Sequence, residues 1–101
     1  MSARFTPGPW LTTGTTVYAL HFARGHVRNK WDCTLYGGAG CPRDELQANA
    51  HLIGAAPELY EALTAMWADY IAVCSTKGWE PTALVEHDMV LAALAKARGE
   101  K

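Results

Sequence analysis

The sequence lacks the features that place a protein in a membrane or in an oxidising compartment. No apolar run approaches the ~18 residues that a membrane-spanning helix needs, and the opening segment MSARFTPGPW lacks the apolar core of a signal peptide. Cysteine is scarce as well, with 3 residues at uneven spacing. An odd number of cysteines in a reducing compartment is expected to remain as free thiols. We therefore expect a cytoplasmic protein.

Acidic residues are almost missing from the first part of the chain. Up to Arg43 there are five basic residues and one acidic residue, Asp32, whereas nine acidic and four basic residues follow from Asp44 onward. The two parts carry formal charges of +4 and −5 within a net charge of −1. This division predicts two faces of opposite sign, which would steer partners rather than shape the fold. An unevenly divided solvated surface is the plainer interpretation.

The length of 101 residues allows one hydrophobic core and argues against two. We therefore expect a single domain over residues 1–101, with a β-hairpin region at 5–36 and a helical region at 42–98. The predicted fold class is α+β, with an N-terminal antiparallel β-hairpin or three-stranded sheet packed on two to three C-terminal helices. Because an isolated hairpin is marginal in water, it must lie on the helices, gain a third strand from residues 11–13 or pair with another chain.

Alternating side chains predict the two strands of the hairpin. In the first strand Tyr18, Leu20 and Phe22 form the apolar face. Gly25 then supplies the positive φ that a hairpin turn needs. In the second strand one set of residues is expected to face water, namely His26, Arg28, Lys30, Asp32 and Thr34, and the other to be mostly buried, namely Val27, Asn29, Trp31, Cys33 and Leu35.

Apolar spacing and proline positions predict the helices. The first helix begins at Pro42 and ends near Ala56, with Leu46, Ala50 and Ile53 on its inner side. A kink or a restart is expected at Pro57. The second helix covers 58–77 and ends at the C-terminal signal Lys77-Gly78. Its apolar stripe comprises Leu59, Leu63, Met66, Trp67, Tyr70, Ile71 and Cys74. The third covers 81–98, with one side formed by Val85, Met89, Ala92, Ala93 and Lys96.

No residue pattern indicates a metal, a cofactor or a catalytic centre. The histidine and cysteine spacings in residues 21–41, His-x₄-His and Cys-x₇-Cys, match no standard zinc site. A cysteine–histidine dyad has no supporting local signature. We therefore expect a protein that is not an enzyme and holds no metal and no cofactor.

An anion site is the first alternative that the sequence leaves open. A strand, a glycine-rich loop and a helix N-terminus follow one another, which is the order that cradles phosphate. The candidate residues are Arg28, Lys30, Gly37, Gly38, Gly40 and Arg43. The loop lacks the Gly-Lys-Ser/Thr ending of a phosphate loop, so a plain flexible loop is the favoured interpretation. A small signalling nucleotide or a nucleic acid would be the ligand of such a site.

A protein interface is favoured over the anion site. Tyr36 at a strand end and Trp79 in a turn are expected to be exposed, and exposed aromatic side chains mark interfaces. The acidic residues Glu58, Glu61 and Asp69 offer a second contact surface on the second helix. The partner would be another protein, and a homodimer is an alternative because symmetric self-association is common.

Two segments carry a resemblance to a known family. Residues 5–10 read FTPGPW and residues 49–63 read NAHLIGAAPELYEAL. They are similar to small phage and prophage proteins that begin with Thr-Pro-Gly-Pro-Trp and later carry Asn-Ala-x-Leu-Ile-Ala-Ala-Ala-Pro-Glu-Leu-x-Glu-Ala-Leu. Gly54 departs from the alanine of that pattern.

The resemblance implies a phage accessory protein in a bacterial host cell. Such proteins often bind and block a host factor, and inhibitors of host defence such as anti-CRISPR proteins are examples. We interpret Trp10, Asn49 and Pro57 as a structural motif. In this hypothesis the alanine-rich helix lets the Pro-Gly-Pro turn approach, and the Asn49 amide satisfies backbone groups beside the prolines. Asn49→Ala would then lower the melting temperature.

Overall fold

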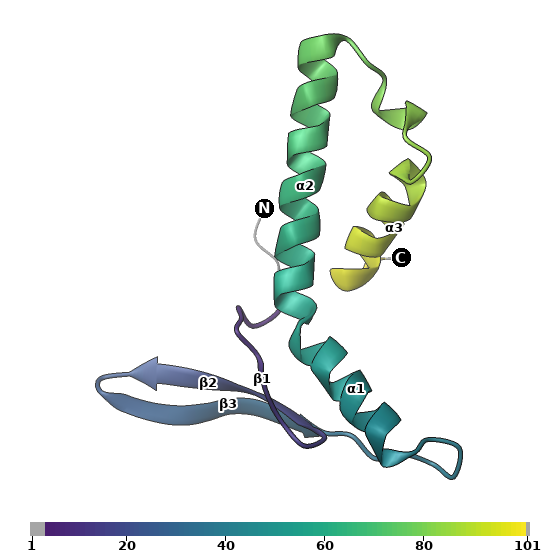
Figure 1. The fold of residues 1–101 in the computed structure, drawn as a ribbon. Coiled ribbons are helices and arrows are strands. Elements are labelled where there is room, and N and C mark those ends of the chain that lie inside the picture. The colour runs from purple at the N-terminus through teal and green to yellow at the C-terminus, as the bar shows by residue number, and fades with distance from the viewer. Residues whose placement is uncertain (1–3, 101) are drawn as a thin grey trace. The chain divides into compact units, whose positions relative to one another are not determined.

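The computed structural model describes residues 4–100. Three strands are followed by two helices, a short 3₁₀ helix and a last helix, as Figure 1 shows. The elements are β1 (Leu11–Thr13), β2 (Thr16–Ala23), β3 (His26–Thr34), α1 (Arg43–Gly54), α2 (Ala56–Lys77), η1 (Pro81–Ala83) and α3 (His87–Ala97). This order confirms the α+β class and resolves the open alternative in favour of a three-stranded sheet.

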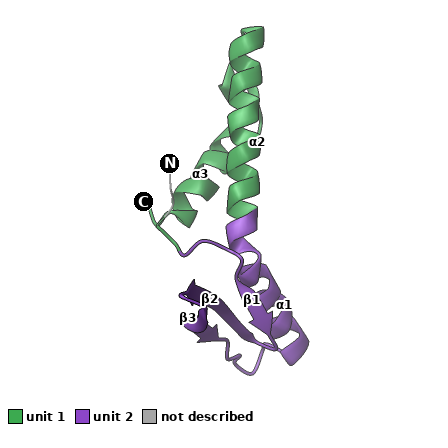
Figure 2. Ribbon diagram, turned by 90° about the vertical axis from the view of Figure 1, so that its left-hand side faces the viewer, with its two compact units in different colours: residues 1–5, 59–101 green, residues 6–58 purple. Residues whose placement is uncertain are grey.

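The chain forms two compact units, which are coloured separately in Figure 2. Unit 1 comprises Met1–Phe5 and Leu59–Lys101, and unit 2 comprises Thr6–Glu58. The boundary falls in the first turn of α2. Whether the two units unfold together as the expected single domain stays a prediction.

The sheet of unit 2 is antiparallel throughout, in the order β1-β2-β3. β1 pairs with the beginning of β2, from Leu11 opposite Tyr18 to Thr13 opposite Thr16. The strand expected at residues 11–13 is therefore present, and it widens the hairpin only at its base. Helix α1 contacts β1 and β2 and covers the same end of the sheet.

The core of unit 2 lies between β2 and α1, and it uses the face of β2 opposite to the one expected. Val17 and Ala19 are buried, whereas Phe22 on the other face is 70% exposed. Small residues line the helix side of this contact, where Ala50 and Gly54 are buried. The expectation that Tyr18, Leu20 and Phe22 form the core face was wrong, because small β2 side chains let the small-residue side of α1 approach closely.

A β-bulge interrupts the alternation of β3. Ala19 pairs with Trp31, but the next residue, Leu20, pairs with Asn29, so Lys30 is left without a partner. An extra residue shifts which side chains share a face. The prediction that one uninterrupted wet face runs from His26 to Thr34 was therefore wrong, because the two halves of β3 on either side of Lys30 alternate out of phase.

The distal half of the hairpin extends beyond β1 and α1 (Figure 1). Every residue from 21 to 30 is exposed. The strands are joined by Arg24 and Gly25, which have φ of 52° and 77°. Positive φ at both positions is the requirement of a type I′ hairpin turn, and only Gly25 meets it without steric cost.

Helix α2 begins anew after α1, as Pro57 predicted. α1 ends at Gly54 and α2 starts at Ala56, so Pro57 occupies the first turn, where its missing N–H costs nothing. α2 ends as its C-terminal signal indicated: Gly78 has a φ of 73°, and the Trp79 N–H donates to the Cys74 carbonyl at 2.9 Å. These contacts are those of a Schellman cap.

The last helix begins six residues later than expected. Pro81 opens the short 3₁₀ helix η1, and α3 starts only at His87. Val85 and Met89, which were expected to form one side of this helix, face outward with exposed fractions of 92% and 70%. Leu94 is buried instead. The prediction failed because a proline favours a first turn of either helix type, and the apolar pattern does not reveal where the chain bends.

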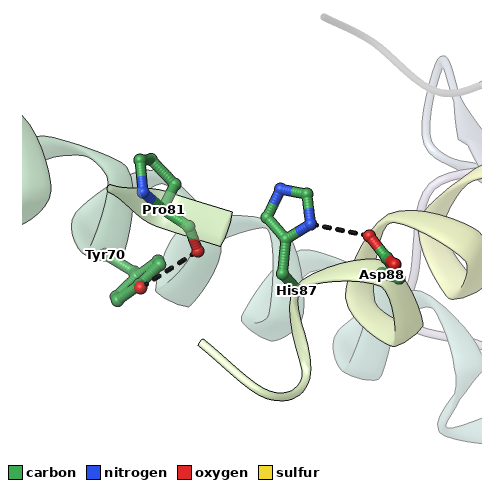
Figure 3. A network of polar contacts seen from close by, with 4 residues as sticks. All are labelled: Tyr70, Pro81, His87 and Asp88. Carbon is green, nitrogen blue, oxygen red and sulfur yellow. Dashed lines mark hydrogen bonds and ion pairs between the residues drawn. The ribbon is translucent and has the colours of Figure 1, made fainter. Parts of the chain in front are cut away.

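Aromatic side chains fill the contact between α2 and the segment after it. The Trp67 ring lies 5.4 Å from His87 and 5.5 Å from Tyr70, measured between ring centroids. Figure 3 shows the Tyr70 hydroxyl directed at the Pro81 carbonyl, to which it donates at 3.2 Å. The buried stripe of α2 is narrower than predicted, because three of its expected members are exposed, namely Leu59, Met66 and Ile71.

Candidate interaction surfaces

The two segments that carry the phage resemblance pack against each other inside unit 2. A Cβ built on Gly8 would lie 3.1 Å from Pro57 Cβ and would collide with the Glu58 carboxylate. Pro57 is fully buried. A Cβ on Gly54 would lie only 2.7 Å from Thr12 Cγ2. Gly8 and Gly54 therefore allow close approach, and the departure from alanine at Gly54 is explained by Thr12.

Trp10 anchors the N-terminal segment, as its sequence position suggested. Its indole N–H donates to the Thr6 carbonyl at 3.0 Å. Its ring also meets Trp31 of β3 edge to face, with centroids 4.9 Å apart. The hydrogen bond holds the segment that precedes β1 in its turn, and the ring contact fixes this segment to the sheet.

Asn49 does not make the contact that the sequence suggested. It lies on an exposed side of α1, and within residues 4–100 its side chain makes no hydrogen bond. The stability loss expected of Asn49→Ala therefore has no contact to produce it. Ala50 and Gly54 are the residues through which α1 meets the sheet.

The candidate anion residues are spread along unit 2 instead of converging. Gly37 follows the base of the hairpin and packs against Cys41, whereas Arg28 pairs with His21 toward the hairpin turn. Six residues of strand separate Arg28 from Thr34, about 20 Å at strand rise. Arg43 lies near Gly14 in the β1–β2 turn. Gly38 and Gly40 face open space, so the structure does not bring the loop and the strand cations together.

The hairpin end gathers a different set of cationic and histidine side chains. His21, Arg24, His26 and Arg28 line one hollow of about 190 Å³ together with Ala23. The pairing of His21 with Arg28 and of Ala23 with His26 places these residues on the same face. Sequence reasoning missed Arg24 and His21, because it treated the turn as a connection and did not foresee the bulge.

A second hollow borders the face of the sheet that carries Leu20 and Phe22. It has a volume of about 370 Å³ and is bounded by the Pro-Gly-Pro turn and by side chains of β1, β2 and β3, namely Leu11, Leu20, His21, Phe22 and Lys30. Phe22 pairs with Val27 across the hairpin, and both are exposed. The hairpin end therefore has a cationic side and an apolar side.

Unit 1 exposes large apolar side chains on both of its helices and in the turn between them. Trp79 is 59% exposed, which confirms the expected exposure of this turn residue. The other exposed apolar side chains of unit 1 are Leu59, Met66, Ile71, Val73, Val85, Met89 and Leu91. Leu59, Met66 and Val73 recur at seven-residue spacing and so lie along one side of α2. Tyr36, also exposed as expected, belongs to unit 2.

Two of the acidic candidates, Glu58 and Asp69, lie beside this apolar side of α2, whereas Glu61 lies nearer the opposite side. Glu58, Glu61 and Asp69 are all exposed. Glu58 and Asp69 are eleven residues apart, which is about three turns, so they share a side of the helix. The Glu58 carboxylate also borders Gly8, and Glu58 therefore contributes to the packing of the N-terminal motif.

Perturbed titratable groups occur only in unit 1 among the residues that the structure covers. Contact with the Cys74 thiol, and then partial burial, raise the pKa of the Tyr70 hydroxyl, which keeps it a hydrogen-bond donor to Pro81. Glu100, and secondarily Tyr60, raise the pKa of Arg98 above its ordinary value. Arg98 in turn lowers the pKa of Glu100, since its Nε donates to the carboxylate at 2.7 Å. Arg98 is also the C-cap residue of α3.

Three further observations concern metals, cysteines and membranes. Within residues 4–100, no group of three or more metal-ligating side chains lies close enough to hold an ion. Cys33 is exposed, Cys41 half-buried and Cys74 buried, and each is a free thiol. Over the same part of the chain, no helix combines the length and the apolarity that crossing a bilayer requires.

Comparison with known proteins identifies a family. No curated protein and no solved structure matches the chain. The family model described as Salmonella phage P22 protein Y8K6 matches residues 1–101, which is the whole sequence. This agrees with the phage resemblance carried by the two segments that pack together in unit 2. The chain belongs to the family of Salmonella phage P22 protein Y8K6.

Proposed function

We propose that this phage accessory protein is not an enzyme and acts in the host cytoplasm by binding a host protein through the helices of unit 1. The observation that supports the proposal is the exposure of large apolar side chains there, above all Met66 at 70%, Trp79 at 59% and Met89 at 70%. Exposed apolar patches mark interaction sites. Methionine suits such surfaces because its flexible side chain adapts to a partner.

The acidic side chains beside the apolar side define the kind of partner. Asp69 borders the line of Leu59, Met66 and Val73 on α2, three residues after Met66 and four before Val73. Glu61, two residues after Leu59, lies nearer the opposite side of the helix. A host protein with an apolar groove and a basic rim fits this combination, because the apolar contact supplies affinity and the rim charges set orientation and association rate. Inhibition of a host defence system, for example as an anti-CRISPR protein, is the narrower form of this proposal and follows from phage origin alone.

The test is affinity capture from lysate of the bacterial host, with mass spectrometry as the readout. The wild-type chain should enrich one host protein, and Met66→Glu and Trp79→Ala should lose it. Ala65→Glu is the matched control, because it places the same charge one residue away on the acidic side of α2 and should retain the partner. Asp69→Lys should weaken capture if the rim contributes, and Glu61→Lys, nearer the opposite side of the helix, should not. Equal capture by Met66→Glu and Ala65→Glu would contradict the proposal.

Self-association is the competing outcome. If the purified chain is a dimer by light scattering and Met66→Glu makes it a monomer, the exposed side of α2 serves a second copy of the chain. The proposal of a host partner at this surface would then fail.

A further inference from the structure

The distal half of the β2–β3 hairpin, residues 20–30, is here called the basic arm. It contains Arg24, Arg28 and Lys30 but no aspartate or glutamate. The acidic residue nearest in the sequence, Asp32, accepts a hydrogen bond from Asn29. Within residues 4–100, no ion pair involves the three cations of the arm. The arm therefore presents uncompensated positive charge on a chain whose net charge is −1.

The arm also lacks the packing that normally stabilises a hairpin. β1 pairs with β2 only as far as Tyr18, so beyond that point the ribbon has two strands with two open edges. Phe22 and Val27 form an exposed apolar pair across it. A two-stranded ribbon of this kind is marginal by itself in water, and a partner on the arm would stabilise it.

We propose that the basic arm binds the phosphate backbone of duplex DNA by entering the major groove. A two-stranded β-ribbon fits that groove. The arm projects about four residues on each strand, or about 13 Å, which exceeds the groove depth of about 8.5 Å. Arg24 and Arg28 lie together at one hollow with His21 and His26, and planar guanidinium groups match the geometry of phosphate oxygens.

The two faces of the arm have separate roles in this arrangement. The cationic face, with Arg24 and Arg28, contacts phosphates and positions the ribbon without reading sequence. The opposite face carries Phe22 and Val27, which meet the apolar edges of bases such as the thymine methyl group. An acidic protein would satisfy the charge, but it would not require a ribbon of these dimensions.

The salt dependence of binding tests the proposal quantitatively. Each phosphate neutralised in duplex DNA contributes about −0.9 to the slope of log K against log salt concentration. Three cations predict a slope of about −2.7, so raising salt from about 50 to about 200 mM should weaken binding about 40-fold. Removing two of the cations should reduce the slope to about −0.9 and the loss to about 3.5-fold.

The experiment is fluorescence anisotropy with a labelled 20-base-pair duplex and the full chain. The arm variant is Arg24→Asn with Arg28→Gln, which keeps the fold because asparagine tolerates positive φ and Arg28 is exposed. The control is Lys77→Gln with Lys96→Gln, which removes the same charge from exposed positions of unit 1. The arm variant should lose binding without any loss of melting temperature, and the control should bind like the wild type.

Three outcomes would overturn the proposal. The first is an absence of duplex binding at low salt. The second is an equal loss in the arm variant and the control, which would indicate attraction to overall charge. The third is tighter binding of a single-stranded 20-mer or of polyglutamate, which would assign the arm to another polyanion. Met66→Glu and Trp79→Ala should leave duplex binding intact, so this proposal and the proposed host-protein contact fail independently.

Discussion

The helices of the two units reach their neighbouring segments by opposite means. In unit 2 the helix contacts depend on missing side-chain atoms, since Gly8 and Gly54 let the N-terminal segment lie directly on the helices. In unit 1 they depend on large rings, with Trp67 and Tyr70 filling the space between α2 and the segment after it. Unit 2 should therefore tolerate added atoms poorly, and unit 1 should tolerate removed atoms poorly.

The largest effect is expected from removing a ring in unit 1. Trp67→Ala should lower the free energy of unfolding by about 2–3 kcal/mol, somewhat less than for a fully buried tryptophan because Trp67 is half-buried. Urea denaturation of the full chain measures the change. Trp79→Ala is the matched control, and it should cost no more than about 0.5 kcal/mol because Trp79 is exposed. Equal losses would refute the role of the Trp67 ring contacts.

The next effect is expected from adding one methyl group to unit 2. Helix propensity alone predicts that Gly54→Ala stabilises α1 by up to about 1 kcal/mol. The contact with Thr12 Cγ2 reverses the sign, and we expect a net loss of about 1 kcal/mol from overpacking. Thermal denaturation measures the change.

A double variant separates the two contributions to Gly54→Ala. Thr12→Ser removes the methyl group that a Cβ at residue 54 would meet, so Thr12→Ser with Gly54→Ala should recover the lost stability. Gly38→Ala, where a Cβ meets no atom within 4 Å, should be close to neutral. A gain in stability from Gly54→Ala alone would show that close approach is not what limits unit 2.

A smaller effect, of opposite sign, is expected at the hairpin turn of unit 2. Arg24 has a φ of 52°, which strains an ordinary side chain. Arg24→Asn should stabilise the chain by about 0.5–1 kcal/mol, since asparagine occupies this region more readily and is favoured in type I′ turns. Arg24→Ala is the control, because it removes the charge without easing the backbone. A gain shared by both variants would point to charge repulsion in the basic arm.

The smallest effect is expected at the end of α3 in unit 1. Arg98 lowers the pKa of Glu100, so the contact stabilises the folded state fully above the ordinary pKa of a glutamate. It is lost as the pH falls through the lowered pKa of the folded state. The melting temperature of the wild type should therefore approach that of Glu100→Gln on acidification. A difference that grows at low pH would contradict this sign.

Local signals in the sequence were sufficient for the elements of the fold. Alternation found β2 and β3, Gly25 marked the turn, Pro57 marked the break between helices and Gly78 marked the end of α2. These signals act through backbone conformation and apply wherever the segment lies. Among the candidate sites, the exposure of Tyr36 and Trp79 followed from their places at a strand end and in a turn.

Other features depended on contacts between distant residues. The bulge at Lys30 follows from the register between β2 and β3, and the alternation of side chains within one strand does not predict it. The late start of α3 follows from the bend after Pro81. For the same reason the glycine loop and Arg28 were grouped by sequence order although a whole strand separates them, and Asn49 was given a contact that its exposed position does not allow.

The sequence by itself determined the α+β class, the order of the elements and the phage family. Local backbone preferences and the two family segments depend only on residues that follow one another in the chain. Only the tertiary structure decided which face of β2 is buried, why residue 54 is glycine and where the positive charge gathers. The first two depend on contacts between residues far apart in the chain, where close packing allows few arrangements, and the third depends on the register of the hairpin, which the bulge shifts.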